Sequence, residues 1–409
     1  MKFQHHRSTP KVSILVSDLS KSGAGRWGGA VRTFLLARAI QNLGCDVEVL
    51  GFIFGDEPPD SIPKNLPFKT AIGQNYPQFL ASASQILSQI EGDILYALRP
   101  KPTTFGLALL KKMQTQRPVI LDIDDWELSW HGGDDWKYQP SLKQFARDIF
   151  KPNGALRYPD APFYLKWMES LVGRADAITV HTEFLQKRFG GVYVPNGKDT
   201  SLFDPSRYDA ETSKQKYGLS EYRILMFPGA PRPYKGVEDV LVALDRLNWS
   251  DLRLAIVGGS PYDDYDRQLM ERWGRWIVKL PPCPVEQMPE VVAAADIVVV
   301  PQRDVPAARA QFPLKLTDAM AMAKPILATR VGDIPAIVED SGFLVEPSSP
   351  EQLAEKIQWI FEHLDPARKR GLNARERCVD RYSIDSMSEI LAPILKLPKA
   401  SSKVVAKSI

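Results

Sequence analysis

Two cations stand in a loop of the second half of the chain, where a strand is expected to end and a helix to begin. In ILMFPGAPRPYKGVEDVLVAL the strand ends at Phe227, Arg232 and Lys235 follow, and the helix begins at Val237. Two positive charges beside a helix N-terminus suit a diphosphate. They could stabilise the charge that develops on a phosphate leaving group. A solvated basic loop without a ligand is the alternative.

A single carboxylate, Asp318, lies inside the apolar stretch FPLKLTDAMAMAK. The spacing of its apolar residues predicts a helix that is apolar on most faces and therefore buried. Burying a carboxylate is costly unless it accepts hydrogen bonds, and a ribose diol would donate two. Pairing with the backbone or with a cation is the other explanation. The expected N-terminus of this helix, which would face the same ligand, consists of Phe312, Pro313, Leu314 and Lys315.

Three carboxylates, Asp122, Asp124 and Asp125, end a strand in RPVILDIDDWELSW. Alternation along the strand puts Asp122 and Asp124 on one face and Asp125 on the other. The first two could hold a divalent metal, Asp124 could act on an acceptor hydroxyl, or the group could cap the following segment. The metal interpretation is the weakest, because the sequence offers no further ligand cluster and side-chain cations already supply positive charge. Asp124 therefore joins Arg232 and Lys235 as a candidate catalytic residue.

Glycines mark two further loops that we assign to donor binding. Gly28 and Gly29 end SKSGAGRWGG, which precedes an amphipathic helix whose N-terminal amides could face an anion. Their spacing is not that of a dinucleotide fingerprint, and a loop without a ligand is an equal alternative. Gly258 follows the strand expected over 253–257.

Arg99, which follows a strand in LYALRPKPTTF, is a candidate for acceptor binding together with Trp126 and His131. The aromatic stretch that begins at Trp126 could pack against a sugar ring or a lipid. No catalytic triad surrounds His131 or His181, which argues against a hydrolase with a side-chain nucleophile. Three cations beside LALL could touch an anionic membrane surface: Lys111, Lys112 and Arg117.

Two successive series of short β-branched runs, alternating with helical stretches, must position these residues. The first series covers 12–17, 46–50, 93–97, 119–123, 177–180 and 192–194, and the second covers 223–227, 253–257, 276–278, 297–300, 326–328 and 342–345. Two series predict an α/β protein with two Rossmann-like, doubly wound domains facing a central cleft. Ligands then bind beyond the carboxyl ends of the strands, so the loops after strands carry the chemistry.

We expect an N-terminal domain over 1–205 with an aromatic insertion at 129–171, and a second domain over 206–385. The polar, Pro- and Gly-rich stretch at 196–220 marks the seam. A C-terminal helix is expected over 386–398, and 399–409 reads as a flexible tail.

The composition of the 409 residues, 44% hydrophobic and 25% charged, is that of a globular protein. No apolar run is long enough for a membrane helix or a secretory signal, so we expect a cytoplasmic protein. The three cysteines are far apart and indicate a reducing compartment with no metal cluster. A net charge of +3 does not point to nucleic acid, and the oligomeric state stays open.

These motifs together resemble the retaining glycosyltransferases of family 4, the group 1 glycosyltransferases with the GT-B fold. The similarity extends over nearly the whole chain and rests on three segments: VPNGKDTSLFDP, PGAPRPYKGVEDVLVAL and FPLKLTDAMAMAKPILATRVGDIPAIV. It implies that a nucleotide-diphosphate sugar binds the second domain with its ribose on Asp318 and its diphosphate on Arg232 and Lys235. It further implies transfer to an acceptor hydroxyl with retention, without a metal or other cofactor. The C-terminal helix would cross back to the first domain.

The chain departs from the family pattern at three places. Ala310 stands where the family usually has a Glu, and Ala230 stands where it has a basic residue, a role that Arg232 could take. The pair Asp124–Asp125 replaces a His–Asp pair near the donor sugar. Two other functions stay open: a nucleotide-sugar-binding subunit with altered catalysis, and a nucleotide-sugar epimerase of the same fold.

Overall fold

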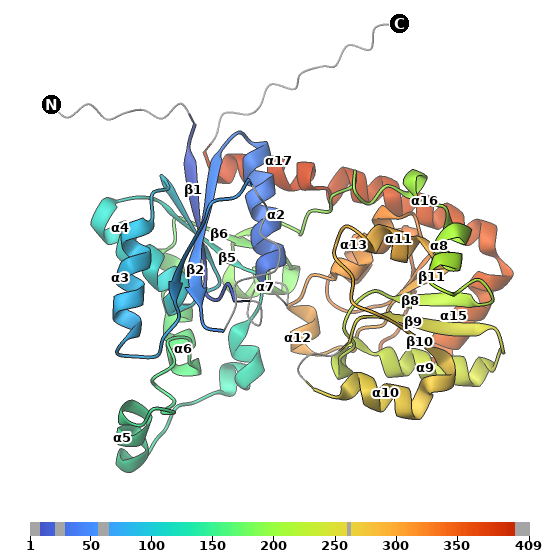
Figure 1. Ribbon diagram of the computed structural model, residues 1–409, viewed down its shortest axis with the longest axis horizontal. Coiled ribbons are helices and arrows are strands. Elements are labelled where there is room, and N and C mark those ends of the chain that lie inside the picture. The colour runs from blue at the N-terminus through green and yellow to red at the C-terminus, as the bar shows by residue number, and fades with distance from the viewer. Residues whose placement is uncertain (1–8, 21–28, 56–64, 260–262, 397–409) are drawn as a thin grey trace, which may run out of the picture. The chain divides into compact units, whose positions relative to one another are not determined.

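The computed structural model describes residues 9–20, 29–55, 65–259 and 263–396 (Figure 1). The chain divides into two compact units. Unit 1 combines the chain up to His181 with Leu185–Val194 and the residues from Met387 on. Unit 2 consists of Thr182–Phe184 and Pro195–Ser386.

Unit 1 contains a seven-stranded parallel sheet with the order β3-β2-β1-β4-β5-β6-β7. The central strands are buried on both faces, because helices cover both sides of a parallel sheet. The strands are β1 (Lys11–Val16), β2 (Asp46–Ile53), β3 (Phe68–Ile72), β4 (Ile94–Leu98), β5 (Val119–Ile123), β6 (Ala177–Val180) and β7 (Val192–Tyr193). The helices are α2 (Gly29–Asn42), α3 (Phe79–Gln89), α4 (Leu107–Thr115), α5 (Leu142–Phe150), α6 (Pro162–Ser170) and α7 (Glu183–Phe189), the last beginning in unit 2.

Unit 2 repeats this architecture with six parallel strands in the order β10-β9-β8-β11-β12-β13. Its strands are β8 (Arg223–Phe227), β9 (Leu252–Val257), β10 (Ile277–Leu280), β11 (Ile297–Val300), β12 (Ile326–Thr329) and β13 (Phe343–Val345). Its helices are α8 (Ala210–Lys216), α9 (Val237–Leu247), α10 (Tyr265–Trp273), α11 (Met288–Ala293), α12 (Pro306–Arg309), α13 (Leu314–Ala321), α14 (Ile334–Val338), α15 (Pro350–Glu362) and α16 (Leu364–Arg381). Helix α17 (Ile384–Ile394) begins in unit 2 and continues in unit 1.

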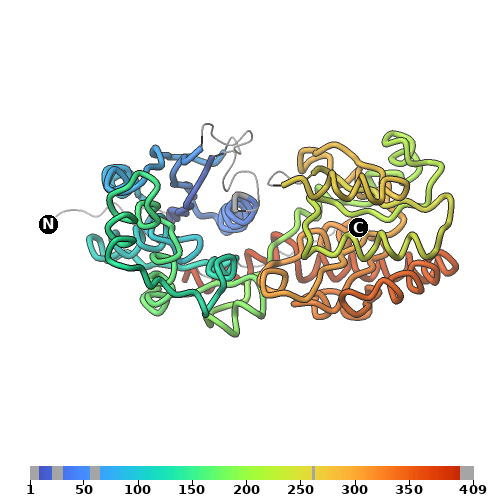
Figure 2. Tube along the Cα trace, turned by 90° about the horizontal axis from the view of Figure 1, so that it is seen from below, coloured from blue at the N-terminus to red at the C-terminus, as the bar shows by residue number. Residues whose placement is uncertain are grey.

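Alternation along the strands of unit 2 creates two separate cores. Ile224 and Met226 of β8 pack with α11, α13 and α16, whereas Leu225 and Phe227 pack with α9 and α15. The two helical layers lie on opposite faces of the sheet and can be followed in two orientations (Figures 1 and 2). Each sheet thus has the doubly wound topology in which the strand order reverses, at β1/β4 in unit 1 and at β8/β11 in unit 2.

The predicted fold class, two Rossmann-like α/β domains, is confirmed. Strand β3 was not expected, because only one of its five residues is buried and an edge strand gives a weak apolar signal. Trp276, where a strand was expected to begin, is the last residue of a 3-10 turn over Gly274–Trp276, and β10 begins one residue later. The compact units divide at Val194 and Pro195, upstream of the expected boundary at 205. None of the described helices has the length and apolar character needed to cross a bilayer.

Candidate functional site

The loop between β8 and α9 in unit 2 brings its two cations to the end of a central strand. A 3-10 turn covers Pro233–Lys235. Gly236, which has a φ of 67°, lies between this turn and the first residue of helix α9. A Cβ at Gly236 would lie 1.8 Å from the carbonyl oxygen of Pro301, so only glycine lets the loop approach the residue after β11 this closely. Lys235 and Arg232 are therefore placed where the strand order of the sheet reverses, the usual ligand position of such folds.

Lys315, on the first turn of α13, joins this pair and completes a cluster of three cations. The Nζ of Lys235 donates a hydrogen bond of 3.2 Å to the carbonyl oxygen of Ala230. Burial, followed by the charges of Lys315 and Arg232, holds the pKa of Lys235 well below its usual value. Burial also lowers the pKa of Lys315. Among the described residues no carboxylate forms an ion pair with Lys235 or Lys315, so an anion bound here would relieve their mutual repulsion.

Because Gly229 has no Cβ, the side chain of Lys315 can lie close to its backbone. A Cβ on Gly229 would lie 3.1 Å from both Cε and Nζ of Lys315, and its φ of 137° disfavours any other residue. The aliphatic part of Lys315 lies on Phe227, with Nζ 4.8 Å from the centre of the ring. Helix α13 begins at Leu314, so Phe312 and Pro313 precede its first turn instead of forming it.

Asp318 has a cationic partner within its apolar surroundings. Its Oδ1 forms an ion pair with Nζ of Lys198, and the carboxylate is 8% exposed. Lys198 also lies 4.4 Å above the ring of Phe203 and pairs through its backbone with Tyr382 and Ile384. The cation that the sequence alone left as an alternative partner for Asp318 is therefore present, and it is the part of the site that sequence reasoning missed.

Gly258 follows β9 with a φ of 83° and donates its N–H to the carbonyl oxygen of Leu280. It lines a hollow of about 490 Å³ with Gly259 and the residues 279–282.

Ala310, at the position where the family usually has a Glu, is fully buried. The next residue, Gln311, accepts a hydrogen bond of 3.1 Å from the hydroxyl of Tyr234. Arg232 forms an ion pair of 3.1 Å with Asp263.

In unit 1 the carboxylates at the end of β5 have different partners. Asp122 is fully buried and accepts hydrogen bonds from Arg32, at 2.8 and 3.1 Å, and from the hydroxyl of Thr179 at 2.6 Å. Arg32 lies on α2, so the helix that begins at Gly29 is tied to β5 by this pair. The described residues contain no group of three or more His, Cys, Asp or Glu side chains that could hold a metal ion. Gly28 lies outside the described residues.

Asp124 is clamped by Arg99, which reaches it from the end of β4. The guanidinium bonds both carboxylate oxygens, at 2.6 and 3.3 Å, and Glu127 at 2.6 Å. Lys101 forms a second ion pair with Glu127 at 3.1 Å. Burial opposes ionisation of Asp124, yet Arg99 lowers its pKa to about 2. Asp124 and Arg99, predicted for separate roles, thus form one charged unit that stays ionised across the neutral range.

The neighbouring Asp125 has different hydrogen-bond partners. Its Oδ2 accepts a hydrogen bond of 3.1 Å from the indole of Trp130, whereas the buried Oδ1 has no hydrogen-bond partner among the described residues. Burial raises the pKa of Asp125 to about 6, and the charge of Arg99 opposes that rise.

The other acceptor candidates differ in exposure. Trp126 is only 8% exposed, and the guanidinium of Arg188 covers its ring at 3.9 Å. His131 is exposed at the end of the 3-10 turn Glu127–His131, next to the half-exposed Trp130. Trp130, which the sequence did not single out, is therefore the more accessible aromatic ring at this end of the sheet.

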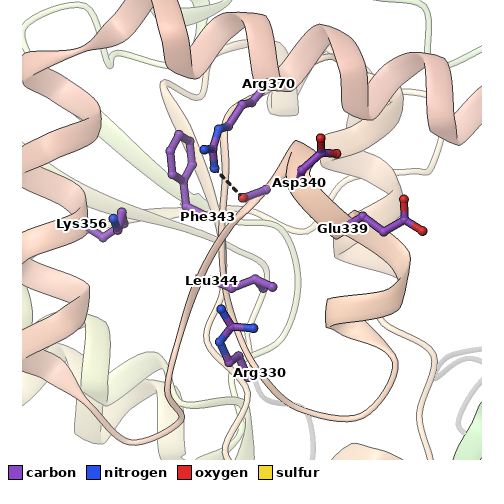
Figure 3. A pocket seen from close by; sticks show the side chains of 8 residues that line it. Arg330, Glu339, Asp340, Phe343, Leu344, Lys356 and Arg370 are labelled. Atoms are coloured by element: carbon purple, nitrogen blue, oxygen red, sulfur yellow. Dashed lines mark hydrogen bonds between the residues drawn. The ribbon is translucent and has the colours of Figure 1, made fainter.

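A second, smaller hollow of about 240 Å³ lies in unit 2 around β13 (Figure 3). Arg370 there donates a hydrogen bond of 3.0 Å to the carbonyl oxygen of Gly342, and Lys356 of α15 lines the hollow. Its lining combines three cations with Glu339 and Asp340, and Glu339 forms an ion pair of 2.7 Å with Arg377, so this hollow, unlike the surroundings of Lys235, contains carboxylates.

Comparison with known proteins gives matches along most of the chain. A family model described as "Glycosyltransferase Family 4" matches residues 27–201, and one described as "Glycosyl transferases group 1" matches residues 222–363. The MMP α-(1→4)-mannosyltransferase of Mycolicibacterium hassiacum is 25% identical over 435 residues, which cover 96% of this chain and 99% of that protein.

A D-inositol 3-phosphate glycosyltransferase of Corynebacterium glutamicum is 28% identical over 231 residues, which cover 51% of this chain and 54% of that protein. The crystal structure of Anabaena HepE in complex with UDP-glucose has a TM-score of 0.72 at 19% identity, covering 95% of this chain and 99% of that one. At this identity the structural likeness establishes the shared fold.

Proposed function

The chain belongs to the family 4, group 1 glycosyltransferases, and we propose that it moves a sugar from a nucleotide-diphosphate sugar to an acceptor hydroxyl with retention and without a metal ion. The observation that carries this proposal is the cluster of Arg232, Lys235 and Lys315, in which burial lowers the pKa of both lysines and, among the described residues, neither lysine forms an ion pair with a carboxylate. A diphosphate supplies the missing negative charge. Related structures that contain UDP or UDP-glucose support a donor of this class.

The donor's diphosphate binds the three cations and the first turn of α13, where Leu314 and Lys315 begin the helix. Its ribose hydroxyls donate to Asp318, which exchanges or shares its contact with Lys198. The base occupies the hollow beside Gly258. These assignments place every donor contact in unit 2.

In the transfer step, the bond between the anomeric carbon and the diphosphate oxygen breaks, and its electron pair stays on the diphosphate. Arg232, Lys235 and Lys315 stabilise that charge, the task that a metal ion performs in other transferases. The acceptor oxygen bonds to the anomeric carbon from the face that the diphosphate leaves, and its proton passes to a diphosphate oxygen. Retention of configuration follows.

The acceptor binds unit 1 at the ends of β4 and β5. Arg99 and Asp124 form a rigid charged pair there, and Trp130 and His131 lie on the surface beside it. A sugar-like acceptor suits this combination, since hydroxyl groups can bond the charged pair while a ring face packs on the indole. Asp124 thereby orients the acceptor, and no free base is needed because the diphosphate takes the proton.

Calorimetric titration with UDP, GDP and ADP, each with and without a chelator, tests this proposal. We expect one nucleotide to bind, with an affinity that the chelator leaves unchanged and that Lys235→Met weakens. Lys356→Met is the matched control, since it removes a lysine of unit 2 from the other hollow. Binding of none of the three nucleotides would overturn the donor assignment.

A positive titration is followed by incubation with the corresponding nucleotide sugars and an acceptor panel. Transfer with an α-linked product from an α-linked donor, measured by NMR, supports retention. Binding without transfer to any acceptor favours the binding-subunit alternative, and conversion of the donor sugar to its epimer favours the epimerase.

A further inference from the structure

Helix α5 of unit 1 has its apolar side turned outward. Figure 1 shows it at the end of an arm that extends from the sheet of its unit. Leu142 is 91% exposed and Phe150 is 77% exposed, and Phe145 and Ile149 are also exposed. Helical spacing brings Leu142, Phe145 and Ile149 onto one face.

The opposite, polar side of α5 is the side that attaches the helix to unit 1. Asp148, 2% exposed, accepts hydrogen bonds from the hydroxyl of Tyr138 at 2.8 Å and from Gln144 at 2.9 Å. A Cβ on Gly154 would lie 2.1 Å from the carbonyl oxygen of Asp148, so the following loop packs closely under the helix. Ser141 caps the helix by accepting the N–H of Gln144. The hydrogen bond from Tyr138 and the close approach of the loop at Gly154 thus hold α5 by the side of Asp148, which leaves the apolar face available.

Exposed cations flank this apolar face. The stretch 137–153 holds Lys137, Lys143, Arg147 and Lys151, all exposed, and its single carboxylate is the buried Asp148. This short stretch therefore carries as much net positive charge as the entire chain, whose formal net charge is +3. Large apolar side chains with cations at their border are the composition of a helix that lies in a membrane interface.

The cations that the sequence suggested for membrane contact are engaged elsewhere in unit 1. Lys111 donates to the carbonyl oxygen of Leu87 at 2.8 Å, and Lys112 forms an ion pair of 2.7 Å with Asp176. Arg117 donates to the carbonyl oxygen of Ile90. These three side chains connect neighbouring elements, whereas Lys143, Arg147 and Lys151 are exposed, and Arg147 has only a 4.0 Å ion pair with Asp148 of its own helix.

We propose that α5 docks this protein on an anionic lipid surface, inserting Leu142, Phe145, Ile149 and Phe150 among the acyl chains while Lys143, Arg147 and Lys151 contact the headgroups. The charge of the cations complements that of an anionic leaflet. Apolar insertion requires no shaped groove or directional bond, and this face offers neither. The inference is independent of the donor and acceptor assignments above.

Co-sedimentation of the full chain with vesicles tests the proposal, using phosphatidylcholine alone and phosphatidylcholine mixed with phosphatidylglycerol. We expect binding to the mixed vesicles that weakens as salt rises from about 0.1 M to about 1 M, over which the Debye length falls from ~10 to ~3 Å. The double variant Phe145→Ser/Phe150→Ser should lower the partition coefficient about tenfold or more. Lys143→Gln/Arg147→Gln should remove most of the preference for the anionic lipid.

The matched control is Leu80→Ser/Leu372→Ser, which removes two leucines of similar exposure from α3 and α16, at 63% and 58%. It should bind vesicles as the unaltered chain does. Circular dichroism establishes that each variant is folded. No binding to mixed vesicles, or binding that the α5 variants leave intact, would overturn the proposal. Self-association in sedimentation velocity that Phe145→Ser/Phe150→Ser abolishes would also overturn it, since the face would then bind a second copy of the chain.

Discussion

The ammonium of Lys198 lies against Oδ1 of Asp318, although 120 residues separate the two in the chain. Both side chains are largely buried, and both belong to unit 2. The carboxylate expected to receive a ribose therefore has a cationic partner within its own unit. Two substitutions distinguish the contribution of this ion pair to stability from the contribution of Asp318 to nucleotide binding.

We expect Lys198→Met to destabilise unit 2, because it leaves a largely buried carboxylate without its partner, a loss of about 1–3 kcal/mol. Ribose hydroxyls would restore hydrogen bonds to Asp318, so a saturating concentration of the nucleotide that binds should raise the melting temperature of this variant more than that of the unaltered chain. Asp318→Ala should instead weaken binding of that nucleotide roughly tenfold or more, as loss of hydrogen bonds to a charged group does. Equal nucleotide-induced shifts in both proteins would contradict the ribose assignment.

Lys235 is predicted to contribute to function at the expense of stability. Lys235→Met removes a buried ammonium that repels Lys315 and Arg232, so the free protein should gain about 0.5–2 kcal/mol of stability. The same variant should lose about a hundredfold in turnover, the usual effect of removing one electrostatic stabiliser. Denaturant unfolding and a transfer assay measure the two effects, with Lys356→Met as the control. A fall in both stability and turnover would mean that Lys235 is structural.

The affinity for the nucleotide diphosphate should begin to fall at a lower pH than it would if Lys235 had the pKa of an ordinary lysine. In the free protein the pKa of Lys235 lies well below 10.5, and a bound diphosphate raises it because it favours the ammonium. Binding therefore takes up a proton once the pH exceeds the free-state pKa, and the dissociation constant increases up to tenfold per pH unit. Titrations over a series of pH values up to 10.5 measure this slope. Lys235→Arg should flatten it, since a guanidinium stays charged; an unchanged slope would assign the proton to another group.

Asp125 should make the protein less stable as the pH rises from about 4 to about 6. Its pKa is about 6 in the folded state against 3.8 as the ordinary value, so the folded chain binds the proton more tightly than the unfolded one in this window. Stability is lost as the proton leaves, and Asp125→Asn should not show this loss. The difference in unfolding free energy between the two proteins, measured from pH 4 to pH 7, isolates the effect. Asp46→Asn, at an exposed carboxylate, should follow the unaltered chain.

Gly229→Ala should affect nucleotide binding through Lys315. Its new Cβ would lie 3.1 Å from Nζ of Lys315 and displace the ammonium. Gly218→Ala is the control, because Gly218 also has a positive φ, of 68°, but has no heavy atom near the position of a Cβ. Both variants should lose stability by roughly 1–3 kcal/mol. Only Gly229→Ala should weaken binding of the nucleotide that the unaltered chain binds, and equal affinities would argue against a role for Lys315.

The sequence by itself determined the elements that consist of contiguous residues. Uninterrupted β-branched runs predicted the buried strands of both sheets, since burial on both faces demands apolar residues throughout. The loop with Arg232 and Lys235 and the apolar helix with Asp318 could be located for the same reason, because the strand, the charges and the helix follow one another within a few residues. The edge strand β3 escaped because it is largely exposed.

Only the tertiary structure decided which charges meet. Lys198 with Asp318, Arg99 with Asp124, and Arg32 with Asp122 join residues 120, 25 and 90 positions apart. Each pair forms because parallel strands and crossover helices return distant segments to the same edge of a sheet, which the local pattern does not encode. The same holds for α5, which lies in the aromatic insertion expected at 129–171: only the exposure of Leu142 and Phe150, together with the burial of Asp148, shows that its apolar face is turned to solvent.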